Sequence, residues 1–150
     1  MDETSTDPDK ARASALAAEL RAVVRKLKRC FREQGNAGDL TPSQISVLHR
    51  LETDGPATLS ALARAEGIRP QSMGATIAPL EAAGLVMGEP DPNDGRQTIL
   101  SLTEACRDWM RQGRAARQDW LHRTIEARLT PDEQERLAAA VELIKRLVDD

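Results

Sequence analysis

The stretch LTPSQISVLHRLETDGPATLSALARAEGIRPQSMGATIAPLEAAGLVMGEPDPNDGRQTILSLTEA, residues 40–105, carries the helix and turn signals that decide the fold. It opens on Thr41, Pro42 and Gln44. The threonine can cap a helix, the proline suits the first helical position, and the glutamine can reach back to the cap. We therefore predict a helix that starts here and stops near the Asp-Gly-Pro sequence at residues 54–56.

Two shorter helices separated by a tight turn are predicted next. Residues 59–66 (LSALARAE) form the first and end at Gly67, and residues 70–83 form the second and end at Gly84. Glycine suits both ends because it readily adopts the left-handed conformation in which many helices terminate. Pro79 lies inside the second helix, where it removes one hydrogen bond. We expect the apolar side chains of this pair to be buried: Leu62, Ala63, Ile68, Ile77 and Leu80.

A β-hairpin follows the helices. Residues 85–87 and 98–102 are short strand-like runs, and the intervening residues 89–95 (EPDPNDG) contain the prolines and glycine typical of a long turn. Helix, turn, helix and hairpin in this order is the arrangement of a winged helix-turn-helix, whose second helix enters the major groove of DNA. The same order also occurs in protein-interaction modules.

Amphipathic helices are predicted on both sides of this region. One covers residues 11–34, a second covers residues 103–128, and a third begins at residues 130–133, which repeat the helix-start pattern of residues 41–44. Residues 1–10 are acidic and polar and predict a disordered tail. The apolar arc of the first helix consists of Leu16, Leu20, Val23, Val24, Leu27 and Phe31, and its opposite side carries Arg21, Arg25, Lys28, Arg29 and Arg32.

The predicted fold is mainly α with a small β-hairpin, in the α+β class. Residues 37–102 form the winged helix-turn-helix unit, and residues 11–36 and 103–150 supply the flanking helices of one compact domain.

Several blocks of the sequence carry a resemblance to a known family. Residues 40–106 closely resemble the MarR family of bacterial transcriptional regulators, and the resemblance extends to the whole chain by the order of its helices. It implies a homodimer held by the flanking helices, which binds double-stranded DNA as a repressor and responds to a small ligand, in many relatives an aromatic acid. The matching blocks are Leu40-Thr41-Pro42 with Gln44, Gly55-Pro56, Leu62-Ala63, Gly67-Ile68, Leu80-Glu81, Gly84-Leu85-Val86, Asp94-x-Arg96 and Leu102-Thr103.

The resemblance assigns DNA contacts to two places. Arg96 matches the arginine that the family inserts into a minor groove, and Asp94 can hold it in a fixed geometry. The alternative for Arg96 is a solvated turn arginine paired with that aspartate.

The second place is the start of the reading helix. Gln71, Ser72 and Thr76 lie on or near its first turns, where they can donate to bases or phosphates, and Arg69 is a candidate phosphate contact. The alternatives are that Ser72 caps the helix and that Gln71 is merely exposed.

The sequence also departs from the family pattern. Ala75 stands where the reading helix often carries an arginine, Gly95 where the wing often has a second basic residue, and Cys106 where a glycine is common. Residues 59–102 contain three basic and five acidic residues, a formal charge of −2. This composition leaves open a second class of function, a winged-helix dimer that no longer reads bases and binds another protein.

Cys30 is a candidate redox sensor because Lys26 and Arg29 could lower its pKa, although most such cysteines are small buried hydrophobes. A redox-sensing regulator is therefore a variant of the first hypothesis. The family's peroxide sensors carry a cysteine near the start of this helix together with tyrosines, and this chain has neither.

Composition excludes other classes of function. Aromatic residues make up 2% of the chain, too few for a surface on which bases stack, and no apolar run is long enough to span a membrane. No catalytic triad, phosphate-binding loop or set of metal ligands is present, and two cysteines cannot form a disulfide framework. We expect a cytoplasmic protein that is neither an enzyme nor a metalloprotein and needs no cofactor.

Overall fold

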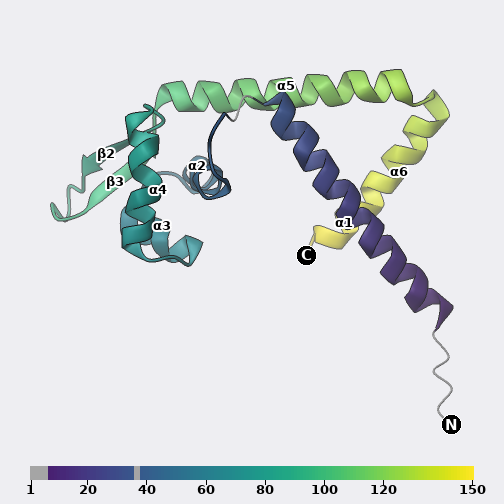
Figure 1. The fold of residues 1–150 in the computed structure, drawn as a ribbon, viewed down its shortest axis with the longest axis horizontal. Helices are drawn as coiled ribbons and strands as arrows, with labels where there is room; N and C mark the ends of the chain where they lie inside the picture. The colour runs from purple at the N-terminus through teal and green to yellow at the C-terminus, as the bar shows by residue number, and fades with distance from the viewer. Residues whose placement is uncertain (1–6, 36–37) are drawn as a thin grey trace, which may run out of the picture. The chain divides into compact units, whose positions relative to one another are not determined.

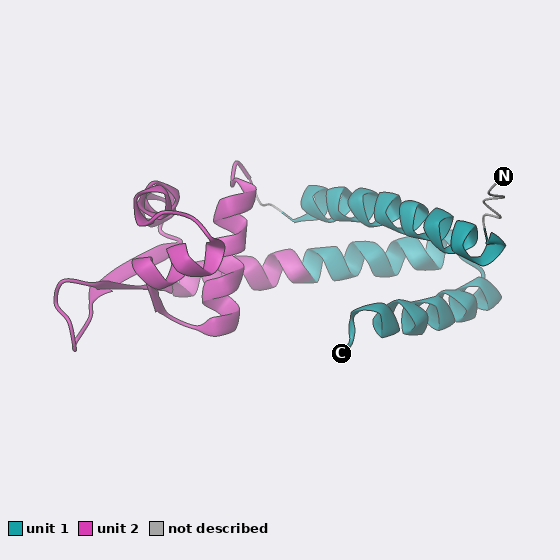
Figure 2. Cartoon of the chain, turned by 90° about the horizontal axis from the view of Figure 1, so that it is seen from below, with its two compact units in different colours: residues 1–36, 115–150 teal, residues 37–114 magenta. Residues whose placement is uncertain are grey.

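The computed structural model describes residues 7–35 and 38–150, which contain six α-helices and a three-stranded antiparallel sheet (Figure 1). The chain divides into two compact units (Figure 2). Unit 1 comprises residues 1–36 and 115–150, and unit 2 comprises residues 37–114.

Unit 2 begins with α2 (Pro42–Asp54), whose start is the predicted capping box. The backbone N–H of Gln44 donates to Thr41 Oγ1 at 3.2 Å, and the backbone N–H of Thr41 donates to Gln44 Oε1 at 2.9 Å. Two of the N–H groups that lack a partner within the helix are thus satisfied by neighbouring side chains.

The helix-turn-helix consists of α3 (Leu59–Glu66) and α4 (Pro70–Ala82). Between them, Gly67 adopts the predicted left-handed conformation, with φ +68°, and Ile68 N–H donates to the Ala63 carbonyl at 3.0 Å. This hydrogen bond closes the turn and sets the direction in which α4 leaves it.

The sheet has the strand order β1-β3-β2, with β1 (Ala57–Thr58), β2 (Val86–Pro90) and β3 (Thr98–Leu102). The sequence did not predict β1, and it placed the end of β2 in the turn. Pro90 is nevertheless paired with Thr98. A proline is tolerated here because β2 is an edge strand, where a missing N–H leaves no neighbouring strand without a partner.

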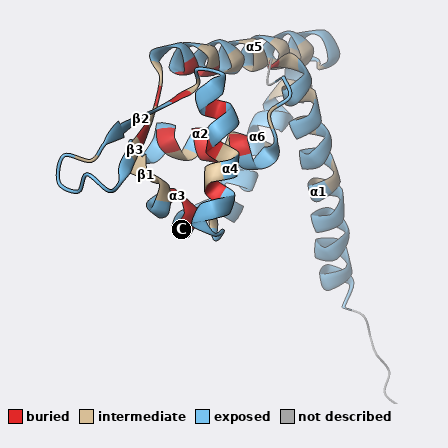
Figure 3. Cartoon of the chain, turned by 60° about the vertical axis from the view of Figure 1, so that its left-hand side comes forward, coloured by how far each residue is buried: buried red, intermediate tan, exposed pale blue. Residues whose placement is uncertain are grey.

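The core of unit 2 lies between α2, α3, α4, the sheet and the start of α5 (Figure 3). Of the five side chains predicted to be buried, Ile68 is the exception, since 37% of it is exposed. It lies in the turn before α4 rather than on a packed helix face, which explains its exposure. The buried apolar residues are Val47, Leu48, Leu51, Leu62, Ala63, Met73, Ile77, Leu80, Val86, Leu100, Leu102, Cys106 and Met110.

The boundary between the units lies inside α5 (Glu104–Arg128), after residue 114, so the first part of this helix, which the sequence assigned to the flanking helices of one compact domain, belongs to unit 2. Cys106 and Met110, on the first turns of α5, are buried in the core of unit 2. Thr103 joins α5 to the sheet region, because its hydroxyl donates to the Gly84 carbonyl at 2.7 Å and accepts from Cys106 N–H at 3.1 Å.

Unit 1 contains α1 (Pro8–Gln34), the rest of α5 and α6 (Pro131–Val148). The sequence placed residues 1–10 in a disordered tail. Residues 8–10 instead form the first turn of α1, because Asp7 accepts a hydrogen bond from Asp9 N–H and Pro8 fits the first helical position. Residues 1–6 lie outside the described part of the chain.

No helix in the described part of the chain is long and apolar enough to cross a membrane.

Candidate nucleic-acid interface

The start of α4 presents the predicted reading residues to solvent. Arg69 is the N-cap residue, and its side chain makes no capping hydrogen bond. Gln71 and Ser72, on the first turn, are exposed. Since Arg69 occupies the cap position, the alternative in which Ser72 caps the helix does not hold.

Thr76 differs from these residues in its hydrogen bonding. Its hydroxyl donates to the backbone carbonyl of Ser72 at 3.1 Å, and the residue is only partly exposed. The donor hydrogen is therefore used inside the helix, which leaves the hydroxyl oxygen as an acceptor and the methyl group as an apolar contact.

The opposite face of α4 anchors the helix in the core. Met73, Ile77 and Leu80, at helical spacing, are at most 2% exposed. Pro79 lies within the helix on the exposed side, so its missing N–H does not interrupt this packing. The position of the exposed face, which carries Gln71, Ser72, Ala75 and Ala78, is consequently fixed by tertiary packing.

The wing is the connection between β2 and β3, and hydrogen bonds within it fix its shape. Asp91 Oδ1 accepts from Asn93 N–H at 2.9 Å, and Asp94 Oδ1 accepts from Arg96 N–H at 3.1 Å. Asp91 N–H donates to the Gln97 carbonyl at 2.9 Å.

Asp94 thus holds the backbone of Arg96 and not its guanidinium. The Arg96 side chain is exposed and forms none of the ion pairs found among the described residues. The alternative in which Asp94 neutralises Arg96 therefore finds no support, and the guanidinium is available to a ligand.

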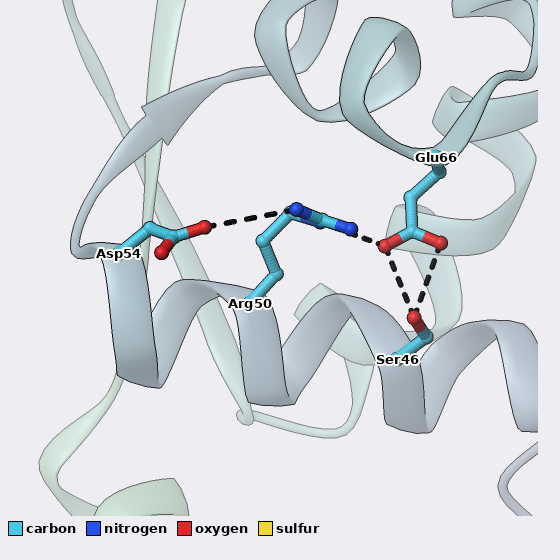
Figure 4. A network of polar contacts seen from close by, with 4 residues as sticks. All are labelled: Ser46, Arg50, Asp54 and Glu66. Carbon is cyan, nitrogen blue, oxygen red and sulfur yellow. Dashed lines mark hydrogen bonds and ion pairs between the residues drawn. The ribbon is translucent and has the colours of Figure 1, made fainter. Parts of the chain in front are cut away.

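A polar network that the sequence did not predict ties α3 to α2 (Figure 4). Arg50 Nε donates to Glu66 Oε1 at 2.8 Å, and the Ser46 hydroxyl lies 3.0 and 3.1 Å from the two oxygens of that carboxylate. Asp54 is 3.7 Å from the other side of the guanidinium. The hydrogen bond from Arg50 holds the pKa of Glu66 below its usual value, with a smaller contribution from Ser46.

The network lies beside the turn that leads into α4, because it includes Glu66. Glu66 is the last residue of α3, directly before the turn that leads into α4. The i, i+4 spacing of Arg50 and Asp54 was a signal for their pairing, but only folding brings Glu66 to Arg50 from 16 residues away. A second link, between Arg114 Nη1 and Glu52 Oε1 at 2.8 Å, ties the first half of α5 to α2.

The charge of unit 2 is unfavourable for a DNA-binding surface. Residues 37–114 contain seven arginines and no lysine against ten acidic residues, a formal charge of −3. Any attraction of this unit to phosphates would come from its exposed arginines, among them Arg69 and Arg96.

The two cysteines are both free, and the structure separates them. Cys106 is fully buried, and burial raises the pKa of its thiol, which disfavours the reactive thiolate. Cys30, on α1, is partly exposed and stays the redox candidate. Among the described residues, no group of three or more His, Cys, Asp or Glu side chains could hold a metal ion.

A helix-turn-helix whose second helix is anchored on one face and exposed on the other, followed by an antiparallel hairpin, defines a winged helix-turn-helix protein. Comparison with known families identifies the family within this class, because the sequence model of the MarR family matches residues 40–98. The chain belongs to the MarR family of DNA-binding transcriptional regulators, which are not enzymes.

Individual relatives agree with this assignment. An uncharacterized HTH-type transcriptional regulator of Mycobacterium bovis is 37% identical over 135 residues, which cover 90% of this chain and 94% of that protein. The HTH-type transcriptional repressor NicR of Pseudomonas putida is 30% identical over 86 residues, 57% of this chain and 54% of that protein. The crystal structure of a Pseudomonas aeruginosa protein described as a transcriptional regulator is similar to this one, with a TM-score of 0.79 and 34% sequence identity. The match covers 93% of this chain and 98% of that chain.

Proposed function

We propose that the chain is a cytoplasmic, homodimeric repressor that binds a pseudo-palindromic duplex operator and is released from it by a small ligand. In this proposal α4 enters the major groove, with Gln71, Ser72 and Thr76 at the bases and Arg69 at a phosphate. Arg96 enters the adjacent minor groove, and Asp94 fixes the backbone that carries it. The observation that carries the proposal is the exposed Arg96 guanidinium, which forms no ion pair with the residues that the structure describes, on a wing fixed by hydrogen bonds.

The homodimer is supported by the apolar side chains of unit 1. The helices α1 and α6, both within the described residues, contain no buried residue. Leu16, Val23 and Val24 of α1 are at least 40% exposed. The same is true on α6 of Val141, Leu143, Ile144, Leu147 and Val148. A second copy of the chain would remove these side chains from water, which is the main favourable term in association.

Repression and release by a ligand rest on the family. The name of NicR, a relative over 57% of the chain, describes a transcriptional repressor. If this chain also represses, deletion of its gene will raise transcription from its own promoter region. If an aromatic acid is the ligand, benzoate will lower the affinity for the operator, because it binds the DNA-free conformation more tightly. Unchanged transcription would contradict repression, and unchanged affinity over a series of aromatic acids would contradict this ligand class.

The central experiment compares DNA affinities by fluorescence anisotropy at low salt, with a duplex from the chain's own promoter region and a random duplex. The wild type should prefer the promoter duplex, and Arg96→Ala should weaken promoter binding by about tenfold, since one specific contact contributes about 1–3 kcal/mol. Arg123→Ala removes the same charge from an exposed position on α5 and is the control. The proposal fails if the wild type shows no preference, or if Arg96→Ala binds like the control.

The second candidate is a winged-helix dimer that binds a protein and not an operator. The formal charge of −3 on residues 37–114 and the exposed Ala75 on α4 favour it. Such a dimer would bind the promoter duplex no better than the random duplex and would copurify with a protein partner.

A further inference from the structure

The side of α1 that faces away from its apolar arc carries a cluster of exposed cations that the reading surface does not use. We call Arg21, Arg25, Lys28, Arg29 and Arg32 the cationic face. At about 100° per residue, the five side chains lie within roughly one third of the helix circumference. An open depression on this side of α1 is lined by Ala22, Arg25, Lys26, Lys28, Arg29 and Arg32.

These cations are not neutralised by their own helix. Charges one turn apart are paired elsewhere in the chain: Arg12 with Asp9 at the start of α1, Arg111 with Asp108 on α5, and Lys145 with Glu142 on α6. No residue of the cationic face belongs to an ion pair among the described residues.

The cations of the face instead lie next to one another. Arg25 is four residues from both Arg21 and Arg29, and Lys28 is four residues from Arg32. Like charges at this spacing destabilise a helix, so the face gains stability when an anion binds to it.

Duplex DNA is the anion that fits this face best. The face covers twelve residues, about 17 Å along the helix, and a duplex carries one charge per about 1.7 Å of its axis. Arginine and lysine are the side chains that form charge-assisted hydrogen bonds to phosphate. An anionic membrane is less suitable, because a helix lying in a membrane inserts its apolar face into lipid. On α1, Phe31 packs edge to face on Trp120, with ring centroids 5.8 Å apart, and the proposed dimer covers the exposed Leu16, Val23 and Val24.

We propose that the cationic face of α1 binds the phosphate backbone of duplex DNA without reading its sequence, an inference that rests on the proposed function. Residues 37–114 have a formal charge of −3 and resist the approach of DNA, whereas residues 21–32 of α1 contain six cations and no acidic residue. Specificity then resides in α4 and the wing, and a large part of the salt-dependent attraction resides in α1. Because phosphate contacts release counterions, the face should make binding depend steeply on salt.

The test uses the full-length triple variant Arg25→Gln, Lys28→Gln, Arg32→Gln, in which glutamine keeps a good helix former at each position. The matched control is Arg123→Gln, Arg128→Gln, Arg136→Gln, three exposed cations of α5 and α6 with no ion pair among the described residues. Fluorescence anisotropy measures both variants and the wild type on a random duplex and on the promoter duplex, from 50 to 200 mM salt. Circular dichroism and sedimentation confirm equal helix content and oligomeric state.

We expect the face variant to lose about 0.9 in the slope of log affinity against log salt for every phosphate contact removed, and at least about 2 in total. Its affinity should fall by a similar factor on both duplexes, so that its preference for the promoter is unchanged, while the control follows the wild type. Equal slopes for the face variant and the control overturn the inference. The inference is also overturned if the face variant binds both duplexes like the wild type and loses only its binding to phosphatidylglycerol vesicles, measured by cosedimentation.

The random duplex separates this inference from the proposed function. A wild type without promoter preference refutes the operator hypothesis, and the slopes on random DNA still decide whether the cationic face binds phosphate. A wild type that prefers its promoter, with a face variant of unchanged slope, supports the operator hypothesis and refutes the inference.

Discussion

The two units of this chain both contain α-helices, but they differ in how far their apolar side chains are exposed. In unit 2, Leu48, Leu62 and Leu80 are at most 2% exposed, and they belong to one buried cluster with side chains of the sheet and of the start of α5. In unit 1, Leu143, Leu147 and Val148 of α6 are 59%, 71% and 75% exposed. Unit 2 thus has a core within one copy of the chain, whereas the helices of unit 1 require something else to cover them.

This difference teaches where stability and assembly are encoded. A core inside one chain stabilises the fold at any concentration, while faces left for a partner make stability depend on protein concentration. In the proposed dimer this division is useful to a regulator, because the reading unit stays rigid while its placement on DNA can respond to changes in the dimerisation helices.

The largest effect is expected from Leu80→Ala in α4. The side chain is fully buried, so its truncation leaves a cavity and should lower the free energy of unfolding by about 2–5 kcal/mol. Urea denaturation followed by circular dichroism measures this change. Leu147→Ala on α6 is the comparison. At protein concentrations below the dimer dissociation constant, it should lower the free energy of unfolding by less than about 1 kcal/mol. Equal losses at such concentrations would show that unit 1 has a core of its own.

The next effect concerns assembly. Ile144→Glu places a carboxylate on the exposed apolar face of α6 and should raise the dimer dissociation constant at least about tenfold, because burial of that charge is unfavourable. Ala61→Glu adds the same charge at an exposed position on α3, outside the helices of unit 1, and should leave dimerisation unchanged. Sedimentation equilibrium measures both constants. A monomeric wild type, or equal effects of the two substitutions, would refute the proposed interface.

A smaller effect is expected from Glu66→Gln, which removes the negative charge between Arg50 and Ser46. We expect a loss of about 1 kcal/mol at pH 7, since the pair is partly exposed, and a loss of promoter preference as the turn before α4 loosens. Glu142→Gln, which removes an exposed pair on α6, should change neither quantity measurably.

The pH dependence gives a second test of Glu66. Its folded-state pKa lies below the ordinary value of 4.5, so the carboxylate stabilises the folded chain at pH values above 4.5. This contribution is lost as pH falls through the lowered pKa, and the wild type and Glu66→Gln should then converge in urea denaturation. A stability difference that stays constant down to pH 3 would contradict this account.

The local features of the fold were accessible from the sequence because their causes are local. Both Thr-Pro capping boxes form as predicted, and the glycines at 67 and 84 adopt the positive φ that ends a helix. The features that were missed depend on distant partners. The short strand β1 exists only because Ala57 pairs with Leu100, and Ile68 is exposed because nothing packs over its turn.

The candidate site also contains features that the sequence predicted and one that depends on distant residues. The sequence identified Arg69, Gln71, Ser72 and Arg96 by position, and the structure places all four on the surface of unit 2. The sequence proposed that Asp94 positions Arg96, and the structure adds that it does so through the backbone N–H. The link between Glu66 and Arg50 could not be predicted, because 16 residues separate them and only the packing of α3 on α2 brings them together.

The sequence by itself determined most helix starts and ends, the order of the helices and the formal charge of −3, because caps, turns and ionisable groups are properties of neighbouring residues. Only the tertiary structure decided which apolar residues form a core and which stay exposed. It also decided which charges are paired and which, as on the cationic face, form no ion pair in the described part of the chain. Burial and pairing are properties of the packed chain, in which residues distant in sequence compete for the same contacts.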